Sequence, residues 1–201
     1  MEKALSLSGY KCRTLYSNTP GVPIVFLHGL SYNIEIWQQI GLSDLLLSTH
    51  VPFLMLDMPY GMKSNCQPKT RNTEKNLSFV SEAIKTVFGD TVPILVGASI
   101  GGHMALQYAT RFPVKGLLLV APARALTDNL PETYGRFTFP VRIIWGSQDN
   151  IVSGEDMRTL EGKLPDAKLK IYNGSGHSAY KNEPEQFKKD LMELYARAEQ
   201  K

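Results

Sequence analysis

The chain has 201 residues, and 22 lysine or arginine residues against 19 aspartate or glutamate residues give it a formal net charge of +3. The positive charges are spread without a basic block, which argues against nucleic acid or a membrane surface as a partner. The length favours a single domain over residues 1–201, and no apolar run approaches the roughly twenty residues that span a bilayer.

The first predicted element is a weakly alternating antiparallel hairpin over residues 4–16, at the edge of a sheet. Later runs rich in Val, Ile and Leu indicate strands that are buried on both faces. These runs cover residues 22–27, 51–56, 92–96, 114–120, 141–145 and 169–172. Helical patterns alternate with them over residues 34–47, 73–88, 101–112, 153–164 and 183–199. The alternation predicts the α/β class, with a mostly parallel sheet and helices on both faces.

The two cysteines, Cys12 and Cys66, lie far apart and lack the spacing of a metal site. Thiols of this kind are reduced by default in the cytosol. The first residues also lack the apolar stretch of a signal peptide. We therefore expect a cytoplasmic protein without a disulfide framework.

The most informative segment is residues 97–102, Gly-Ala-Ser-Ile-Gly-Gly, between a predicted strand and a predicted helix. A serine nucleophile on a tight strand-to-helix turn needs glycines two residues before and two residues after it, because the backbones approach closely there. The N-terminus of the following helix favours negative charge at the reacting centre. Ser99 is the candidate nucleophile.

A serine hydroxyl needs a base to take its proton, and His177 is the best candidate because it lies in a glycine-rich loop after the last predicted strand. Asp149 follows the strand over residues 141–145 and is the candidate carboxylate that orients the imidazole. Alone, Asp149 fits equally well as the cap of the helix that begins near residue 153. The chain order Ser99, Asp149, His177 is nevertheless that of α/β-hydrolases.

Attack on a carbonyl carbon requires N–H donors for the developing oxyanion. The backbone N–H of Ile100, directly after the nucleophile, is one expected donor. The second donor is expected from the loop after the strand over residues 22–27, where we choose Leu30.

These segments together resemble the α/β-hydrolase superfamily over essentially the whole chain. His28-Gly29 with Trp37 is similar to its oxyanion-loop signature, residues 57–64 to its D-x-P-G-x-G-x-S loop, and residues 97–102 to its nucleophile elbow. The resemblance implies an α/β-hydrolase fold and supports the five site residues chosen above. It is greatest to small members without a cap, among them the esterase-like group called interacting factor B.

In the loop after Asp57, Tyr60 and Met62 stand where the family usually has glycines. We name both as possible pocket residues, together with Ser31 and Tyr32, which follow the oxyanion loop. Trp37 is expected to be helix core.

Many relatives insert a large helical cap at the position of residues 121–139, whereas this segment has room for a helix or two. Arg124, Tyr134 and Phe137 of the segment are expected to border the entrance. The pocket should therefore be shallow and open, and long lipid chains should fit it poorly.

The sequence thus predicts a carboxylesterase that cleaves small or accessible esters or thioesters through an acyl-enzyme, without a metal or an organic cofactor. Its expected partner is a small-molecule ester, and its oligomeric state is open. The same triad would also serve amide deacylation, acyl transfer, C–C hydrolysis or perhydrolysis. A binding protein on an inactive hydrolase fold is the alternative from another class.

Overall fold

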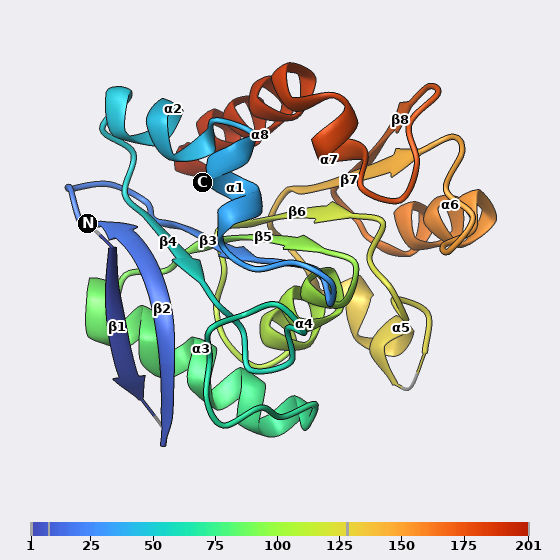
Figure 1. The fold of residues 1–201 in the computed structure, drawn as a ribbon. Helices are drawn as coiled ribbons and strands as arrows, with labels where there is room; N and C mark the ends of the chain where they lie inside the picture. The colour runs from blue at the N-terminus through green and yellow to red at the C-terminus, as the bar shows by residue number, and fades with distance from the viewer. Residues whose placement is uncertain (1, 8, 128, 201) are drawn as a thin grey trace.

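The computed structural model describes residues 2–7, 9–127 and 129–200. Within these ranges the strands form one eight-stranded sheet in the order β1-β2-β4-β3-β5-β6-β7-β8 (Figure 1). The strands are β1 (Glu2–Leu7), β2 (Tyr10–Ser17), β3 (Ile24–Leu27), β4 (Phe53–Leu56), β5 (Ile94–Ala98), β6 (Gly116–Val120), β7 (Val141–Gly146) and β8 (Ala167–Tyr172). The pairs β1–β2 and β2–β4 are antiparallel, and all other pairs are parallel. This architecture confirms the predicted mostly parallel sheet with an antiparallel hairpin at its N-terminal edge.

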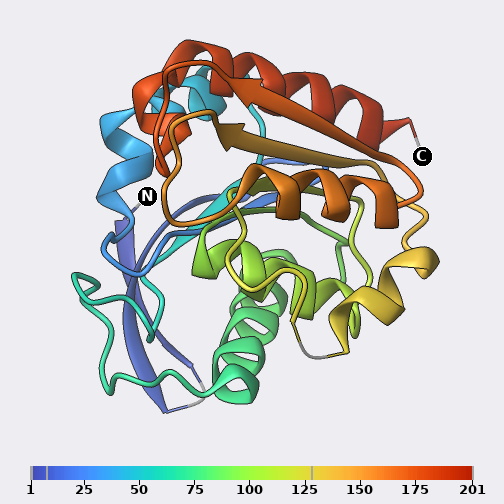
Figure 2. The same cartoon turned by 90° about the vertical axis from the view of Figure 1, so that its right-hand side faces the viewer.

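Helices cover both faces of the sheet (Figure 2). They are α1 (Glu35–Gln39), α2 (Leu42–Ser48), α3 (Thr73–Phe88), α4 (Ile100–Ala109), α5 (Leu130–Thr133), the 3-10 turn η1 (Tyr134–Arg136), α6 (Gly154–Lys163), α7 (Ala179–Asn182) and α8 (Pro184–Glu199). Apolar side chains of α1, α2, α7 and α8 form the core on one face, and those of α3, α4 and α6 form the core on the other. No helix in the described part of the chain is long and apolar enough to cross a membrane.

The helix predicted over residues 34–47 is two helices in the structure. Gly41 adopts a left-handed conformation with φ 72°, which ends α1 and begins α2. Trp37 of α1 is fully buried, and its ring centroid lies 5.4 Å from that of Phe26 and 5.1 Å from that of Tyr180. The interpretation of Trp37 as helix core is therefore confirmed.

The connection between β6 and β7 is short, as predicted, and its described residues contain only α5 and η1. Tyr134 and Phe137 do not border an entrance, because both side chains are buried in the core beneath this connection. The Tyr134 hydroxyl donates to the Ala125 carbonyl, which links two parts of the connection to each other. No large cap rises over the sheet within the described ranges.

The expectation of two free thiols is wrong, because Cys12 and Cys66 are joined by a disulfide. Their neighbours Lys11 and Gln67 form an isolated antiparallel bridge, with N···O distances of 2.7 and 3.0 Å. This bridge places the two cysteines, which are 54 positions apart in the sequence, beside each other. Reduced thiols were one ground for expecting a cytoplasmic location, and the bond removes that ground.

Candidate functional site

Ser99 lies on a tight turn between β5 and α4, with φ 53° and ψ −116°. This is a strained conformation for a residue with a side chain. A Cβ added to Gly97 would lie 2.4 Å from the Gly101 carbonyl oxygen, and one added to Gly101 would lie 2.1 Å from the Leu27 carbonyl oxygen. Both glycines of the G-x-S-x-G pattern are therefore required by close backbone approach.

Three backbone hydrogen bonds hold Ser99 in this turn. Its N–H donates to the Val120 carbonyl at 2.9 Å, and its carbonyl accepts from His103 and Ala123, each at 3.1 Å. The bonds come from β6, from α4 and from the connection after β6. The position of the serine is thus fixed by three separate segments.

Asp149 and His177 are hydrogen-bonded through their side chains, as the loop positions predicted. His177 Nδ1 donates to Asp149 Oδ2 at 2.8 Å, while Oδ1 of the same carboxylate accepts from the N–H groups of Ile151 and Val152 at 2.8 and 3.1 Å. The Asp149 side chain is completely buried. Ser153, rather than Asp149, caps α6, since its Oγ accepts from Asp156 N–H at 3.0 Å.

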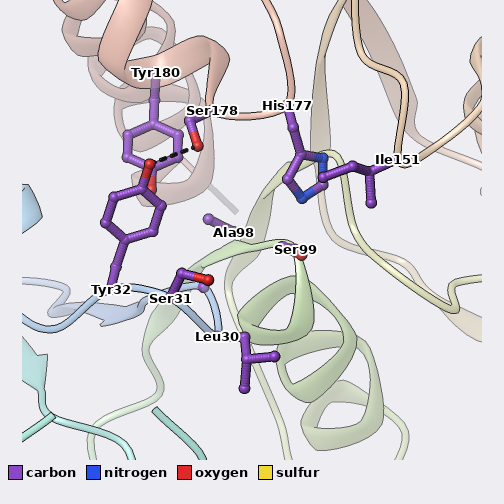
Figure 3. A pocket seen from close by; sticks show the side chains of 10 residues that line it. Leu30, Ser31, Tyr32, Ala98, Ser99, Ile151, His177, Ser178 and Tyr180 are labelled. Carbon is purple, nitrogen blue, oxygen red and sulfur yellow. Dashed lines mark hydrogen bonds between the residues drawn. The ribbon is translucent and has the colours of Figure 1, made fainter. Parts of the chain in front are cut away.

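A cavity of about 210 Å³ connects Ser99 with His177. We call it the tyrosine cavity, and it is lined by Ser31, Tyr32, Ser99, His177, Ser178 and Tyr180, among others. Figure 3 shows the imidazole of His177 directed toward Ser99, with the two tyrosines facing them across the cavity. The Tyr32 hydroxyl lies 3.1 Å from Ser178 Oγ. The structure therefore brings Ser31 and Tyr32 to the same cavity as the candidate nucleophile.

A second cavity, of about 330 Å³, also reaches Ser99. We call it the arginine cavity, and it is lined by Leu30, Tyr60, Arg71, Ser99, His103 and Arg124, among others. Leu30 and Ser99 border both cavities. A group bound to Ser99 Oγ could therefore extend into either cavity.

The two expected oxyanion donors lie beside Ser99. Ile100 is the first residue of α4, and the first N–H groups of a helix have no acceptor within the helix. Leu30 borders both cavities, and its carbonyl accepts from Met62 N–H at 2.8 Å, which fixes the peptide unit that follows it.

His28 holds the oxyanion loop through hydrogen bonds that the sequence did not reveal. Its Nδ1 donates to the Gly29 carbonyl at 2.8 Å, and its Nε2 accepts from Met58 N–H at 2.9 Å. The Tyr60 hydroxyl donates to the His28 carbonyl at 2.6 Å. Burial lowers the pKa of His28 to about 4, so the ring is neutral at physiological pH.

Asp57 completes this arrangement, which we call the loop clamp (His28, Asp57 and Tyr60). Asp57 Oδ1 accepts from Ile34 N–H at 2.8 Å, and Oδ2 accepts from Asn65 N–H at 2.9 Å and from Arg13 Nε at 3.2 Å. The carboxylate is fully buried. The only sequence signal for it was the D-x-P pattern at residues 57–59.

The two residues that replace family glycines have different positions. Tyr60 is buried and borders the arginine cavity through the loop clamp. Met62 does not line either cavity at Ser99: its side chain is 66% exposed, on a turn held by the Gly61 N–H bond to the Met58 carbonyl. Gly61 itself is required, because an added Cβ would lie 2.4 Å from His28 Cε1.

Within the described ranges, no group of three or more His, Cys, Asp or Glu side chains is arranged to hold a metal ion. The charged or ionisable groups nearest Ser99 include the imidazole of His177, which is paired with a carboxylate, and the two arginines of the arginine cavity.

Comparisons with known proteins agree with this fold. Residues 24–142 match the model of the Alpha/beta hydrolase family. The chain is 25% identical to Protein ABHD14A of Danio rerio over 89% of its own length and 66% of the relative's, and 27% identical to Protein ABHD14A of Homo sapiens over 83% and 61%. It therefore spans about two thirds of the length of these relatives.

Two further relatives extend the picture. The human "Putative protein-lysine deacylase ABHD14B" is 25% identical over 85% of this chain and 81% of its own length. The structure of a "predicted CIB-like hydrolase" from Thermoplasma acidophilum superposes with a TM-score of 0.86 over 96% of each chain at 21% identity, which concerns the fold alone. With the family model covering residues 24–142, the chain belongs to the alpha/beta hydrolase family.

Proposed function

We propose that this protein is a serine hydrolase that cleaves small or accessible carboxylic esters or thioesters through an acyl-enzyme. The observation that carries the proposal is the 2.8 Å hydrogen bond between Asp149 and His177, at a cavity that also contains Ser99. His177 is 19% exposed, so its second ring nitrogen is accessible from that cavity. A wholly structural histidine would have both nitrogens bonded within the fold.

In the proposed reaction, Ser99 Oγ attacks the carbonyl carbon while His177 Nε2 takes the hydroxyl proton. Asp149 stabilises the resulting imidazolium through Nδ1. The backbone N–H groups of Leu30 and Ile100 stabilise the oxyanion. His177 then gives the proton to the leaving alcohol or thiol. In the second half of the reaction, His177 takes a proton from a water molecule as it attacks the acyl-enzyme, and then returns the proton to Ser99 Oγ as the acid is released.

The size of the site supports small or accessible substrates. The cavities of about 210 and 330 Å³ lie at or below the lower end of the roughly 300–1,000 Å³ typical of drug-sized ligands. The short connection that carries α5 and η1 provides little to enclose a long chain. A series of p-nitrophenyl esters should therefore give its highest kcat/KM at acyl lengths of about two to four carbons, and a preference for long chains would contradict this part of the proposal.

The direct test is the Ser99→Ala variant with p-nitrophenyl acetate. The variant should lose at least three orders of magnitude in kcat/KM, because the attacking atom is removed. Ser78→Ala, which changes an exposed serine of α3, is the matched control and should retain the wild-type rate. A fluorophosphonate probe should label the wild type at Ser99. Absence of an adduct on correctly folded protein would favour the binding-protein alternative.

Amide deacylation is the second candidate, and the name of the 25% identical human relative ABHD14B favours it. The same residues would carry it, with His177 protonating the departing amine. Acetyl-lysine peptides assayed beside p-nitrophenyl acetate would separate the two. If the wild type hydrolyses p-nitrophenyl acetate in a Ser99-dependent manner but does not hydrolyse the acetyl-lysine peptides, amide deacylation is excluded and ester hydrolysis remains.

A further inference from the structure

The arginine cavity joins two cationic side chains to the candidate nucleophile. Arg71 comes from the segment before α3 and Arg124 from the connection after β6, and both line the cavity that reaches Ser99. None of the residues lining this cavity is an aspartate or a glutamate. Within the described ranges, no carboxylate forms an ion pair with Arg71. The wall of the cavity, as far as the structure describes it, thus contains two cationic side chains and no acidic one.

The backbone that carries Arg71 is held by specific hydrogen bonds. Thr70 N–H donates to the Pro59 carbonyl at 3.1 Å. The buried side chain of Asn76 donates through Nδ2 to the carbonyls on either side of Arg71, those of Thr70 at 3.2 Å and Asn72 at 2.8 Å. The guanidinium thus extends from a fixed segment rather than from an unsupported loop.

The backbone of Arg124 is linked to the nucleophile. The N–H of the preceding residue, Ala123, donates to the Ser99 carbonyl at 3.1 Å. Arg124 has φ 55°, and its carbonyl accepts from the Thr127 hydroxyl at 2.9 Å. Positive φ is a strained conformation for a residue with a side chain, and it persists where the surrounding structure holds it. Arg124 thus lines the cavity of Ser99 from a segment that is bonded to the Ser99 carbonyl.

The position of His177 determines which part of a substrate enters which cavity. His177 must reach the leaving group to protonate it, and it lines the tyrosine cavity but not the arginine cavity. The alcohol or thiol part of a substrate therefore lies in the tyrosine cavity. The acyl part, on the other side of the carbonyl carbon, extends into the arginine cavity.

Given the serine hydrolase activity proposed above, on which this inference rests, we propose that the preferred acyl group is that of a short dicarboxylic acid. Its free carboxylate is bound by Arg71 and Arg124, since guanidinium groups pair with carboxylates through two parallel hydrogen bonds. The substrates are monoesters or monothioesters of such acids. Hydrolysis consumes one water and yields the dicarboxylate and the alcohol or thiol.

The test compares two esters of nearly equal size, monoethyl glutarate and ethyl valerate, which differ in a terminal carboxylate against a methyl group. Both are followed in a pH-stat, which measures the proton released with each new carboxylic acid. The wild type should prefer monoethyl glutarate. Arg71→Ala and Arg124→Ala should each lower the ratio of the two kcat/KM values about tenfold, and the double variant about a hundredfold, chiefly through KM.

Arg136→Ala is the matched control, because Arg136 is an exposed arginine of the same connection that does not line the cavity. It should leave the ratio unchanged. Fluorophosphonate labelling of Ser99 in each variant checks that the site is still assembled. Raising the ionic strength should raise KM for monoethyl glutarate more than for ethyl valerate.

The other outcomes separate the two proposals. If Ser99 is required for hydrolysis of both esters but the ratio does not respond to the arginine variants, the acyl assignment is wrong and the hydrolase function stands. If the variants instead impair hydrolysis of 4-acetoxybutyrate relative to butyl acetate, the cavity binds the alcohol part and the assignment is again overturned. If no ester is hydrolysed in a Ser99-dependent manner, the proposed function itself fails.

Discussion

A histidine and an aspartate lie on each side of Ser99, and the two pairs are held in different ways. On the side of β3 and β4, both ring nitrogens of His28 are hydrogen-bonded to the backbone, and Asp57 is bonded to two N–H groups and to Arg13. On the side of β7 and β8, His177 uses one nitrogen for Asp149 and presents the other to a cavity. The side-chain types are the same, but only the second pair has an atom available for reaction.

The difference lies in the second ring nitrogen, which is bonded to the backbone in His28, whereas the ring of His177 lines a cavity. Burial of His28 lowers its pKa to about 4 and keeps it neutral, which suits a fixed donor and acceptor. His177 is partly exposed and lines the cavity that also contains Ser99. Variants on the two sides should therefore affect different properties, catalysis on one and folding on the other.

The largest effect is expected for Asp149→Asn. Loss of the carboxylate should lower kcat about 10⁴-fold, because the imidazole loses the partner that sets its tautomer and stabilises its charge. Thermal unfolding and steady-state kinetics with p-nitrophenyl acetate measure the two properties separately. Asp156→Asn, at an exposed acid of α6, is the control. Near-normal kcat in Asp149→Asn would remove the distinction between the two pairs.

Asp57→Asn should act on stability. Removing the charge of a buried carboxylate that is paired with Arg13 should cost about 4 kcal/mol in the free energy of unfolding. Urea denaturation measures this cost, with Asp44→Asn, at an exposed residue of α2, as the control. The comparison would fail if Asp57→Asn kept its stability and instead lost activity to the same degree as Asp149→Asn.

Part of the site could be predicted from the sequence, and part could not. Ser99, Asp149 and His177 could be named as candidates because each follows a strand with a local signal, and parallel strands bring their carboxyl ends together. The loop clamp was missed because its residues are bonded to distant parts of the chain. Asp57, for example, pairs with Arg13, which is 44 residues away and shares no local pattern with it. The same is true of the Cys12–Cys66 bond, since pairing across a sheet edge depends on the completed fold.

The pocket walls were harder to predict than the site itself. Met62, Tyr134 and Phe137 were expected at a surface near Ser99, but side-chain direction in irregular segments is decided by contacts that periodicity does not describe. Arg124 was expected to border the entrance, and it lines the arginine cavity. Arg71, which lines the same cavity, had no signal in the sequence.

His28 predicts a specific dependence of stability on pH. Its pKa is about 4 in the folded protein and near 6.5 when unfolded, so below pH 6.5 the unfolded state binds more protons. The contribution is complete above pH 6.5 and is lost as the pH falls to about 4, amounting to about 3 kcal/mol. His28→Asn should flatten this part of the curve, whereas His50→Asn, at an exposed residue, should not.

An NMR titration of the wild-type His28 ring tests the same point without a substitution. Protonation of the ring above pH 5.5 would show that the loop clamp does not keep it neutral.

The smallest effect is expected for Ser153→Ala. Its hydroxyl caps α6, so its loss should cost about 1 kcal/mol of stability. The kcat should stay at the wild-type value, because the described hydrogen bonds of His177 and of the Asp149 carboxylate do not include Ser153. A substantial fall in kcat would show that helix capping and acid placement are not separable in this loop.

The hydrogen bond from Ala123 to Ser99 has a consequence for protein engineering. The beginning of the connection after β6 is tied to the nucleophile, while Gly135 in η1 is exposed and an added Cβ there would meet nothing within 4 Å. Exposed turns of this kind are preferred sites for tolerated insertions. A helical hairpin grafted at Gly135 would enlarge this connection, while the turn that positions Ser99 stayed as it is.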